Sequence, residues 1–187
     1  MKKISKIVSI IFILIIGVIV LTGCENKVGN LVKIAENKRE ITKGDLPGYT
    51  VYTHTSGVQF SYPSNWKSLG TTSKPAFANQ TNGTNVNLVT ETVPAILNFD
   101  SYITASIESI KKQLPIIGDI SRENVKINGK DASILKYKMK QSDITVNLNQ
   151  ACFIDSNTAY ILTVAVIDTN EESDAPIVDN IISSFMK

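Results

Sequence analysis

The strongest constraint on the fold is a set of turn signals between runs of alternating apolar and polar residues. Asn-Gly is the strongest short signal for a β-hairpin, and Asn128-Gly129 stands between the strand-like runs "ENVKI" and "KDASIL". Further hairpins are predicted about "TSG" at 55–57, "TNG" at 81–83 and "DSNT" at 155–158. Strands joined by such short turns pair antiparallel. The chain therefore predicts an antiparallel sheet built from neighbouring strands.

Two amphipathic helices interrupt the strand pattern. One is predicted over residues 99–114, capped by Asn98 or Asp100 and ended by Pro115. The other is predicted from residue 175 to the end, capped by Ser173 or Asp174. Their apolar stripes consist of Phe99, Ile103, Ile107, Ile110 and Leu114, and of Ile177, Val178, Ile181, Ile182 and Phe185. Each stripe needs a surface to cover, so the fold class expected is α+β, an antiparallel sheet with helices packed on its faces.

The first 23 residues are typical of an export signal. Lys2, Lys3 and Lys6 precede the apolar run 7–21, which is shorter than the roughly 20 residues of a spanning helix. "LTGC" resembles the bacterial lipobox, which implies that Cys24 carries diacylglycerol, with further acyl chains such as palmitate, and becomes the mature N-terminus. An uncleaved N-terminal anchor is the alternative. Either way the rest of the chain lies outside the cytoplasmic membrane.

The sequence divides into three parts. Residues 1–23 form the lipoprotein signal peptide, and 24–48 form the lipidated cysteine with a polar tether that ends in Gly and Pro. Residues 49–187, from Tyr49, form one domain of ordinary size.

Removing the signal changes the charge and the cysteine count. The whole chain has 19 basic and 17 acidic residues, so loss of three lysines leaves 16 against 17. No basic patch remains to bind nucleic acid. Cys152 would then be the one unmodified cysteine, with no partner for an intrachain disulfide, and its apolar strand predicts a small buried hydrophobe.

Candidate catalytic and metal-binding groups are few. His54 has no neighbouring acid or cysteine, and no phosphate loop, metal-spaced Cys or His pair, or nucleophile elbow occurs. The sequence therefore predicts no enzyme, no catalytic residue, no cofactor and no metal.

An acidic stretch and two glycosylation sequons resemble functional sites, but each has a simpler structural explanation. Residues 168–179 resemble a calcium loop from Asp168 to Asp179, but Ser173 replaces its turn glycine and the last ligand is not Glu. We favour helix capping there. Asn79 and Asn82 form glycosylation sequons, and turn chemistry explains them better in a bacterial protein.

The order "VQFSYPSNW", "NVNLVTE", helix, "KINGKDA", "NQACFIDSNTAYILTVAV" and "IISSF" resembles the PsbP/DcrB-like family. The resemblance spans about residues 49–185 and implies a small α/β/α sandwich, often made as a lipoprotein. It also implies structural roles for Trp66 beside Pro63, for Gly129 in a turn and for Tyr160 across the sheet. Accessory or binding roles are expected from it, not catalysis.

Two functions are consistent with these features. The first is a non-catalytic, membrane-tethered module that binds or assembles an envelope protein through its sheet surface or loops. The alternative is a small-ligand or cation binder, or an unrecognised hydrolase, with a pocket between the sheet and the helix over 99–114. The expected location is the extracytoplasmic face of the cell membrane, and abundant Ile, Asn and Lys favour a low-GC Gram-positive source.

Overall fold

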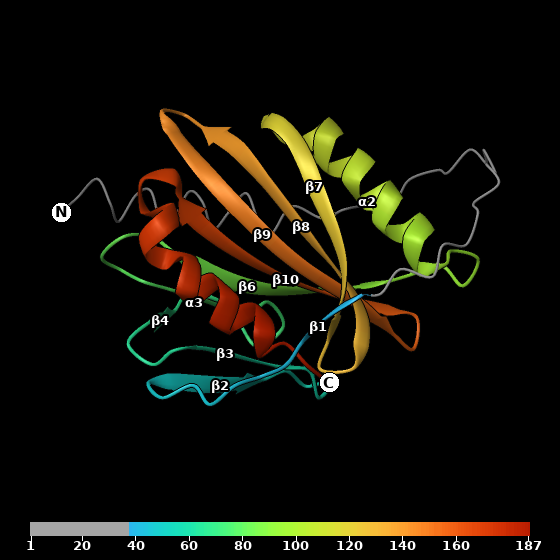
Figure 1. Cartoon of the computed structure of the whole chain (residues 1–187), viewed down its shortest axis with the longest axis horizontal. Helices are drawn as coiled ribbons and strands as arrows, with labels where there is room; N and C mark the ends of the chain where they lie inside the picture. Colours follow the sequence, from blue (N-terminus) through green and yellow to red (C-terminus); the bar gives the residue numbers. More distant parts are fainter. Residues whose placement is uncertain (1–37) are drawn as a thin grey trace.

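The computed structural model describes residues 38–187, which form a twisted eight-stranded sheet with helices on its two faces (Figure 1). The strand order is β1-β7-β8-β9-β10-β6-β5-β4, and β2 pairs with β3 in a separate hairpin. The elements are β1 Arg39–Ile41, β2 Tyr49–Thr53, β3 Gln59–Pro63, β4 Lys67–Ser68, β5 Ala76–Ala78, β6 Asn85–Thr92, α2 Phe99–Gln113, β7 Ile116–Ile127, β8 Lys130–Gln141, β9 Ile144–Asp155, β10 Thr158–Ile167, the 3₁₀-helix η1 Asp168–Asn170 and α3 Glu171–Ser183. The α+β prediction is confirmed.

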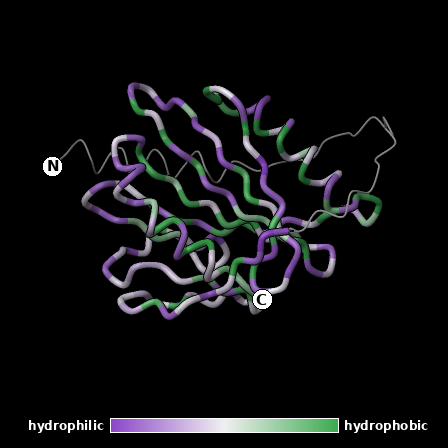
Figure 2. Tube along the Cα trace, in the orientation of Figure 1, coloured by the Kyte–Doolittle hydropathy of each residue, from purple (hydrophilic) through white to green (hydrophobic). Residues whose placement is uncertain are grey.

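The predicted hairpins all form. β2 pairs with β3, β5 with β6, β7 with β8 and β9 with β10, each antiparallel. Asn128 and Gly129 have φ values of 48° and 81°, the left-handed region that a two-residue hairpin turn requires. Hydrophilic and hydrophobic residues alternate along part of the sheet (Figure 2), as in the Lys-Tyr-Lys-Met-Lys run of β8, whereas β10 is buried on both faces and almost entirely apolar.

Two pairings depart from a sheet built only of antiparallel neighbours. β10 pairs antiparallel with β6, although α2, β7, β8 and β9 lie between them in the chain. β1 pairs with β7 in parallel, Arg39 opposite Val125 and Ile41 opposite Ile127. Turn signals reveal only sequence neighbours, so neither long-range pairing was predictable from them.

β1 also lies within the segment 24–48 that the sequence analysis assigned to the tether. Three residues, two of them charged, show no strand alternation. Their pairing depends on the exposed edge of β7, which the local sequence does not reveal. From Arg39 onward, therefore, the polar segment includes part of the sheet.

The sheet separates two apolar clusters. One contains Trp66, Phe153, Tyr160 and Phe185 with the buried face of α3 and the β2–β3 hairpin. The other contains Leu148, Ile161 and Cys152 with α2. The amide of Trp66 donates to the carbonyl of Pro63 at 2.9 Å. The roles that the resemblance implies for Trp66, Gly129 and Tyr160 match these positions.

The helix boundaries confirm one prediction and correct another. Asn98 caps α2, because its side chain accepts from the Ser101 amide at 2.8 Å, and α2 ends at Gln113. α3 begins at Glu171 and not near residue 175. The predicted caps Ser173 and Asp174 are therefore inside the first turns of α3, since η1 leads directly into it.

No helix within residues 38–187 is long and apolar enough to cross a membrane.

Candidate functional site

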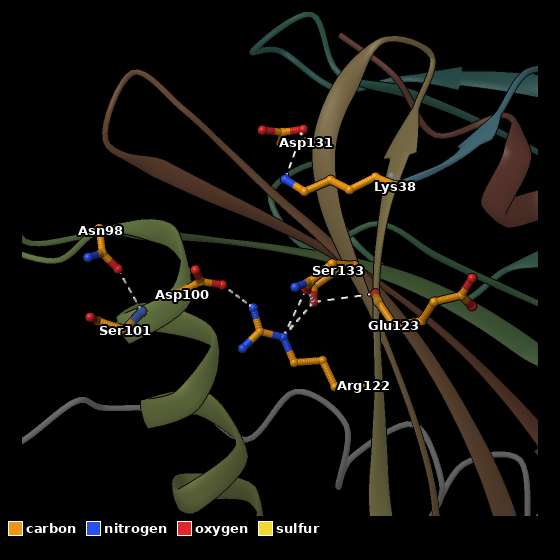
Figure 3. A network of polar contacts seen from close by, with 9 residues as sticks. Lys38, Asn98, Asp100, Ser101, Arg122, Glu123, Asp131 and Ser133 are labelled. Atoms are coloured by element: carbon orange, nitrogen blue, oxygen red, sulfur yellow. Dashed lines mark hydrogen bonds and ion pairs between the residues drawn. The ribbon is translucent and has the colours of Figure 1, made fainter. Parts of the chain in front are cut away.

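A network of polar contacts lies where α2 meets β7 and β8 (Figure 3). The Arg122 Nε donates to Asn124 Oδ1 at 2.9 Å and to Ser133 Oγ at 3.1 Å. Its Nη2 pairs with the carboxylate of Asp100 at the start of α2. Ser133 is fully buried and also donates to Asn124 Oδ1 at 2.9 Å.

The strand period explains why these side chains meet. Arg122 and Asn124 are two residues apart on β7, and Ser133 lies opposite Asn124 on β8, so all three point to one face. Asp100 stands in the first helical turn, where the helix dipole favours a carboxylate. The guanidinium thus joins the start of α2 to β7 and β8.

A second polar contact on this face joins α2 to the end of β6. The Tyr102 hydroxyl donates to the half-buried carboxylate of Glu91. Burial raises the pKa of Glu91, with the bond from Tyr102 opposing it, and burial also raises the pKa of Tyr102. The pair joins α2 to the end of β6 at the edge of the apolar cluster that contains α2.

Cys152 lies close to this pair and is 2% exposed. Burial raises the pKa of its thiol, so the thiolate that a nucleophile needs is disfavoured at neutral pH. This position matches the small buried hydrophobe that the sequence predicts.

The acids of the calcium-like stretch point to different partners. Asp168 accepts from Lys138 at 2.9 Å and from Asn147 at 3.1 Å, while Asp174 accepts from Thr84 and from Asn82, the latter at 2.9 Å. Lys138 lowers the pKa of Asp168. Within residues 38–187 no three His, Cys, Asp or Glu side chains are gathered as metal ligands.

The remaining sequence candidates lie in turns. His54 Nδ1 is 2.8 Å from Ser56 Oγ and 3.3 Å from the Ser56 amide, within the β2–β3 turn. Asn79 Oδ1 accepts from the Thr81 amide at 2.9 Å. Asn82 Oδ1 likewise accepts from the Thr84 amide at 3.1 Å, so both sequon asparagines make turn contacts. Cys24, the predicted lipidation site, lies outside the described residues.

Sequence reasoning missed Arg122, and it named Asp174 only as a helix cap and not as the acceptor for Thr84 and Asn82. Each is bonded to residues distant in the chain, Arg122 to Asp100 across 22 positions and Asp174 to Thr84 across 90. The alternation of "SRENVKI" does place Arg122 and Asn124 on one face. It does not identify the helix residue that they meet.

A single sheet with α2 on one face, and α3 with the β2–β3 hairpin on the other, defines an α/β/α sandwich of the PsbP type. The chain belongs to the PsbP-like protein family, whose model matches residues 7–186.

Solved structures of low identity share this fold. Cyanobacterial PsbP (CyanoP) from Synechocystis is 12% identical with a TM-score of 0.56, covering 76% of this chain and 94% of that chain. A protein of unknown function from Pseudomonas aeruginosa is 17% identical with a TM-score of 0.55, covering 74% and 96%. The Ran-binding protein Mog1p from Saccharomyces cerevisiae is 9% identical with a TM-score of 0.53, covering 74% and 94%. A search of curated protein sequences gives no match.

Proposed function

We propose that this protein is a lipoprotein, anchored through Cys24 on the extracytoplasmic face of the membrane, that acts as a non-catalytic binding or assembly module of the cell envelope. Its direct partners are the membrane, through the lipid, and an envelope protein, through the folded domain. Nucleic acid is not among them.

The observation that carries this proposal is that the reactive side chains of the domain serve the fold. Arg122 is bonded to Asp100, Asn124 and Ser133, and the Cys152 thiol is buried and protonated. The contacts of His54 close a turn. An enzyme needs such groups converging on a shared reacting atom, and the contacts of Arg122, Cys152 and His54 within the described chain do not involve one another.

The comparisons support a binding role by analogy. A cyanobacterial PsbP and a Ran-binding protein have this fold. Neither protein is named for a catalytic activity.

Acylation tests the anchor directly. Cells expressing the full chain are labelled with a clickable palmitate analogue, and wild type is compared with Cys24→Ala and Cys152→Ala. We expect Cys152→Ala to carry label and remain in the membrane fraction, because its thiol is internal, and Cys24→Ala to lose both. Label retained by Cys24→Ala would refute the anchor.

Crosslinking in intact membranes, followed by mass spectrometry, tests the module. One recurrent envelope protein that is recovered with wild type and Cys152→Ala, and lost with Cys24→Ala, is the expected result. The binding role is refuted if the protein is abundant and correctly anchored but no recurrent partner is crosslinked to it.

A further inference from the structure

The β2–β3 hairpin has a strand edge that pairs with no other described strand. β2 pairs with β3 alone, and it lies along the lower border of the molecule (Figure 1). Thr50, Val51 and Thr53 are exposed, Val51 at 48%. Within the described chain, the outer edge of β2 is therefore accessible to another molecule.

The register of the hairpin shows which backbone groups this edge presents. Along an antiparallel pair, residues whose N–H and C=O groups face the other strand alternate with residues whose groups face away from it. On β3, Gln59 exchanges two hydrogen bonds with Met186, at 2.8 and 3.0 Å, and the Ser61 amide donates to the C-cap side chain of α3 at 2.7 Å. Both β3 residues thus face away from β2. Thr53 and Val51, which lie opposite them, must likewise face away from β3.

Val51 and Thr53 therefore offer two N–H donors and two C=O acceptors in a row. Within residues 38–187, these groups form no backbone hydrogen bond with another element. The two residues are about 6.7 Å apart, the repeat at which any extended strand presents its own outward groups. An extended backbone can satisfy both the donors and the acceptors at this spacing, which is the geometry of strand addition.

The composition of β2 leaves this edge unprotected. Proteins commonly shield exposed strand edges with charge, proline, a bulge or very short strands. The two edges of the eight-stranded sheet follow this rule, since β1 has three residues, two of them charged, and β4 has two residues, one of them Lys67. β2 instead has five residues, Tyr-Thr-Val-Tyr-Thr, without charge, proline or bulge, and all are favourable in strands. Of these three edges, β2 is the one suited to pairing with another chain.

We propose that β2 pairs antiparallel with β2 of a second copy of this chain, so that two hairpins form one four-stranded sheet. A two-fold axis at Tyr52 places Val51 opposite Thr53 of the second copy, and the free groups of both strands then form four hydrogen bonds. The second copy brings a strand of the same length with no charge to desolvate. Because so few bonds hold the pair, it needs the high local concentration of the membrane plane, and to that extent it rests on the proposed anchor.

Disulfide formation between copies tests the register. The full, lipidated chain carries Cys152→Ala, so that the introduced cysteine is the reactive thiol. Val51→Cys and Thr53→Cys, with different epitope tags, are expressed together, and membranes are oxidised with copper phenanthroline. Residues that face each other have Cα atoms about 5.5 Å apart, which a disulfide can bridge, whereas identical positions lie diagonally at about 7–8 Å. We expect mixed dimers from the two variants together and loss of the dimer when either is expressed alone.

Energy transfer between fluorescently tagged copies, reconstituted together in vesicles, tests the backbone bonds. Val51→Pro removes one outward N–H from each chain, and an edge strand tolerates proline at such a position. Two of the four bonds are lost, so association should weaken about thirtyfold. The Tm should equal that of wild type, because this N–H has no partner inside the hairpin. Val51→Thr is the matched control, since it keeps the N–H and the branched shape of an exposed side chain, and it should associate as wild type does.

Each contrary result overturns the inference. Same-site dimers as abundant as mixed dimers, unchanged association of Val51→Pro, or no energy transfer between wild-type copies would each do so. A lowered Tm of Val51→Pro would also do so, because it would mean that the Val51 N–H is bonded within the domain. If copies do not pair while Cys24 is still acylated and the envelope protein is still crosslinked, the self-association is wrong and the proposed function stands.

Discussion

Asn128 joins three distant parts of the domain, and its replacement gives the sharpest prediction for stability. Its Nδ2 donates to the carbonyls of Ser183 at 2.9 Å and Phe185 at 3.1 Å, and its Oδ1 accepts from the Lys43 amide at 2.9 Å. Its own amide donates to the Ile41 carbonyl at 2.8 Å. The side chain therefore links the residues after β1 to the end of α3.

The magnitude follows from these contacts. Asn128→Ala removes three side-chain hydrogen bonds, each contributing about 1 kcal/mol. Placing alanine at φ 48° adds about 1 kcal/mol, because asparagine tolerates the left-handed region better. We therefore expect about 4 kcal/mol of lost unfolding free energy. For a domain of this size that is a fall in Tm of about 8–16 °C.

Urea unfolding of four proteins separates the two contributions. Asn157→Ala in the β9–β10 turn is the control, since Asn157 has φ 61° and should lose only the conformational part, about 1 kcal/mol. Asn128→Gly keeps the turn and loses the side-chain bonds, so it should lose about 3 kcal/mol. If Asn128→Ala and Asn157→Ala lose the same free energy, the side-chain bonds contribute nothing and the reasoning is refuted.

Three further predictions concern buried and paired groups. Asp174→Ala leaves the buried Thr84 hydroxyl and the Asn82 side-chain amide without their acceptor. Thermal unfolding should therefore show a loss of about 2 kcal/mol in the free energy of unfolding. A loss below about 0.5 kcal/mol would contradict the role given to Asp174. Cys152, fully buried with a raised pKa, should resist iodoacetamide at pH 8 in the folded protein and react in urea; rapid native labelling would contradict its burial. Lys187 and Lys130 hold the pKa of Asp155 at about 2, below the unfolded value of about 3.9, so its stabilisation is full above about pH 4 and lost as pH falls towards 2. Urea unfolding between pH 2 and 5 should show a shallower loss for Asp155→Asn than for wild type, and identical slopes would exclude this contribution.

The sequence predicts those features that local chemistry determines. Asn128-Gly129 and Asn98 act within a few residues of themselves, so their turn and cap were readable. β1 depends on an edge that is formed 86 positions later, as the pair Arg39 and Val125 shows. Asp174 was predicted to cap the helix because Asp is a common N-cap residue. Its hydrogen-bond partner Thr84, however, lies 90 positions away in the chain. The buried polar residues Asn87 and Thr163 likewise depend on the assembled sheet, because only the register of β6 against β10 places them opposite each other.

The parallel attachment of β1 has a mechanical consequence in an anchored chain. If the chain is anchored as proposed, a pull from the membrane reaches the sheet through β1, which is held by three residue pairs and by the bidentate contact of Arg39 with Glu123. The β7–β8 pair behind it is far longer, so force would peel β1 away before the sheet opens. Residues 39–48 would then lengthen the tether by about 34 Å in the extended state. Detachment of β1 alone would thus let the domain move away from the membrane while the rest of the sheet stays folded.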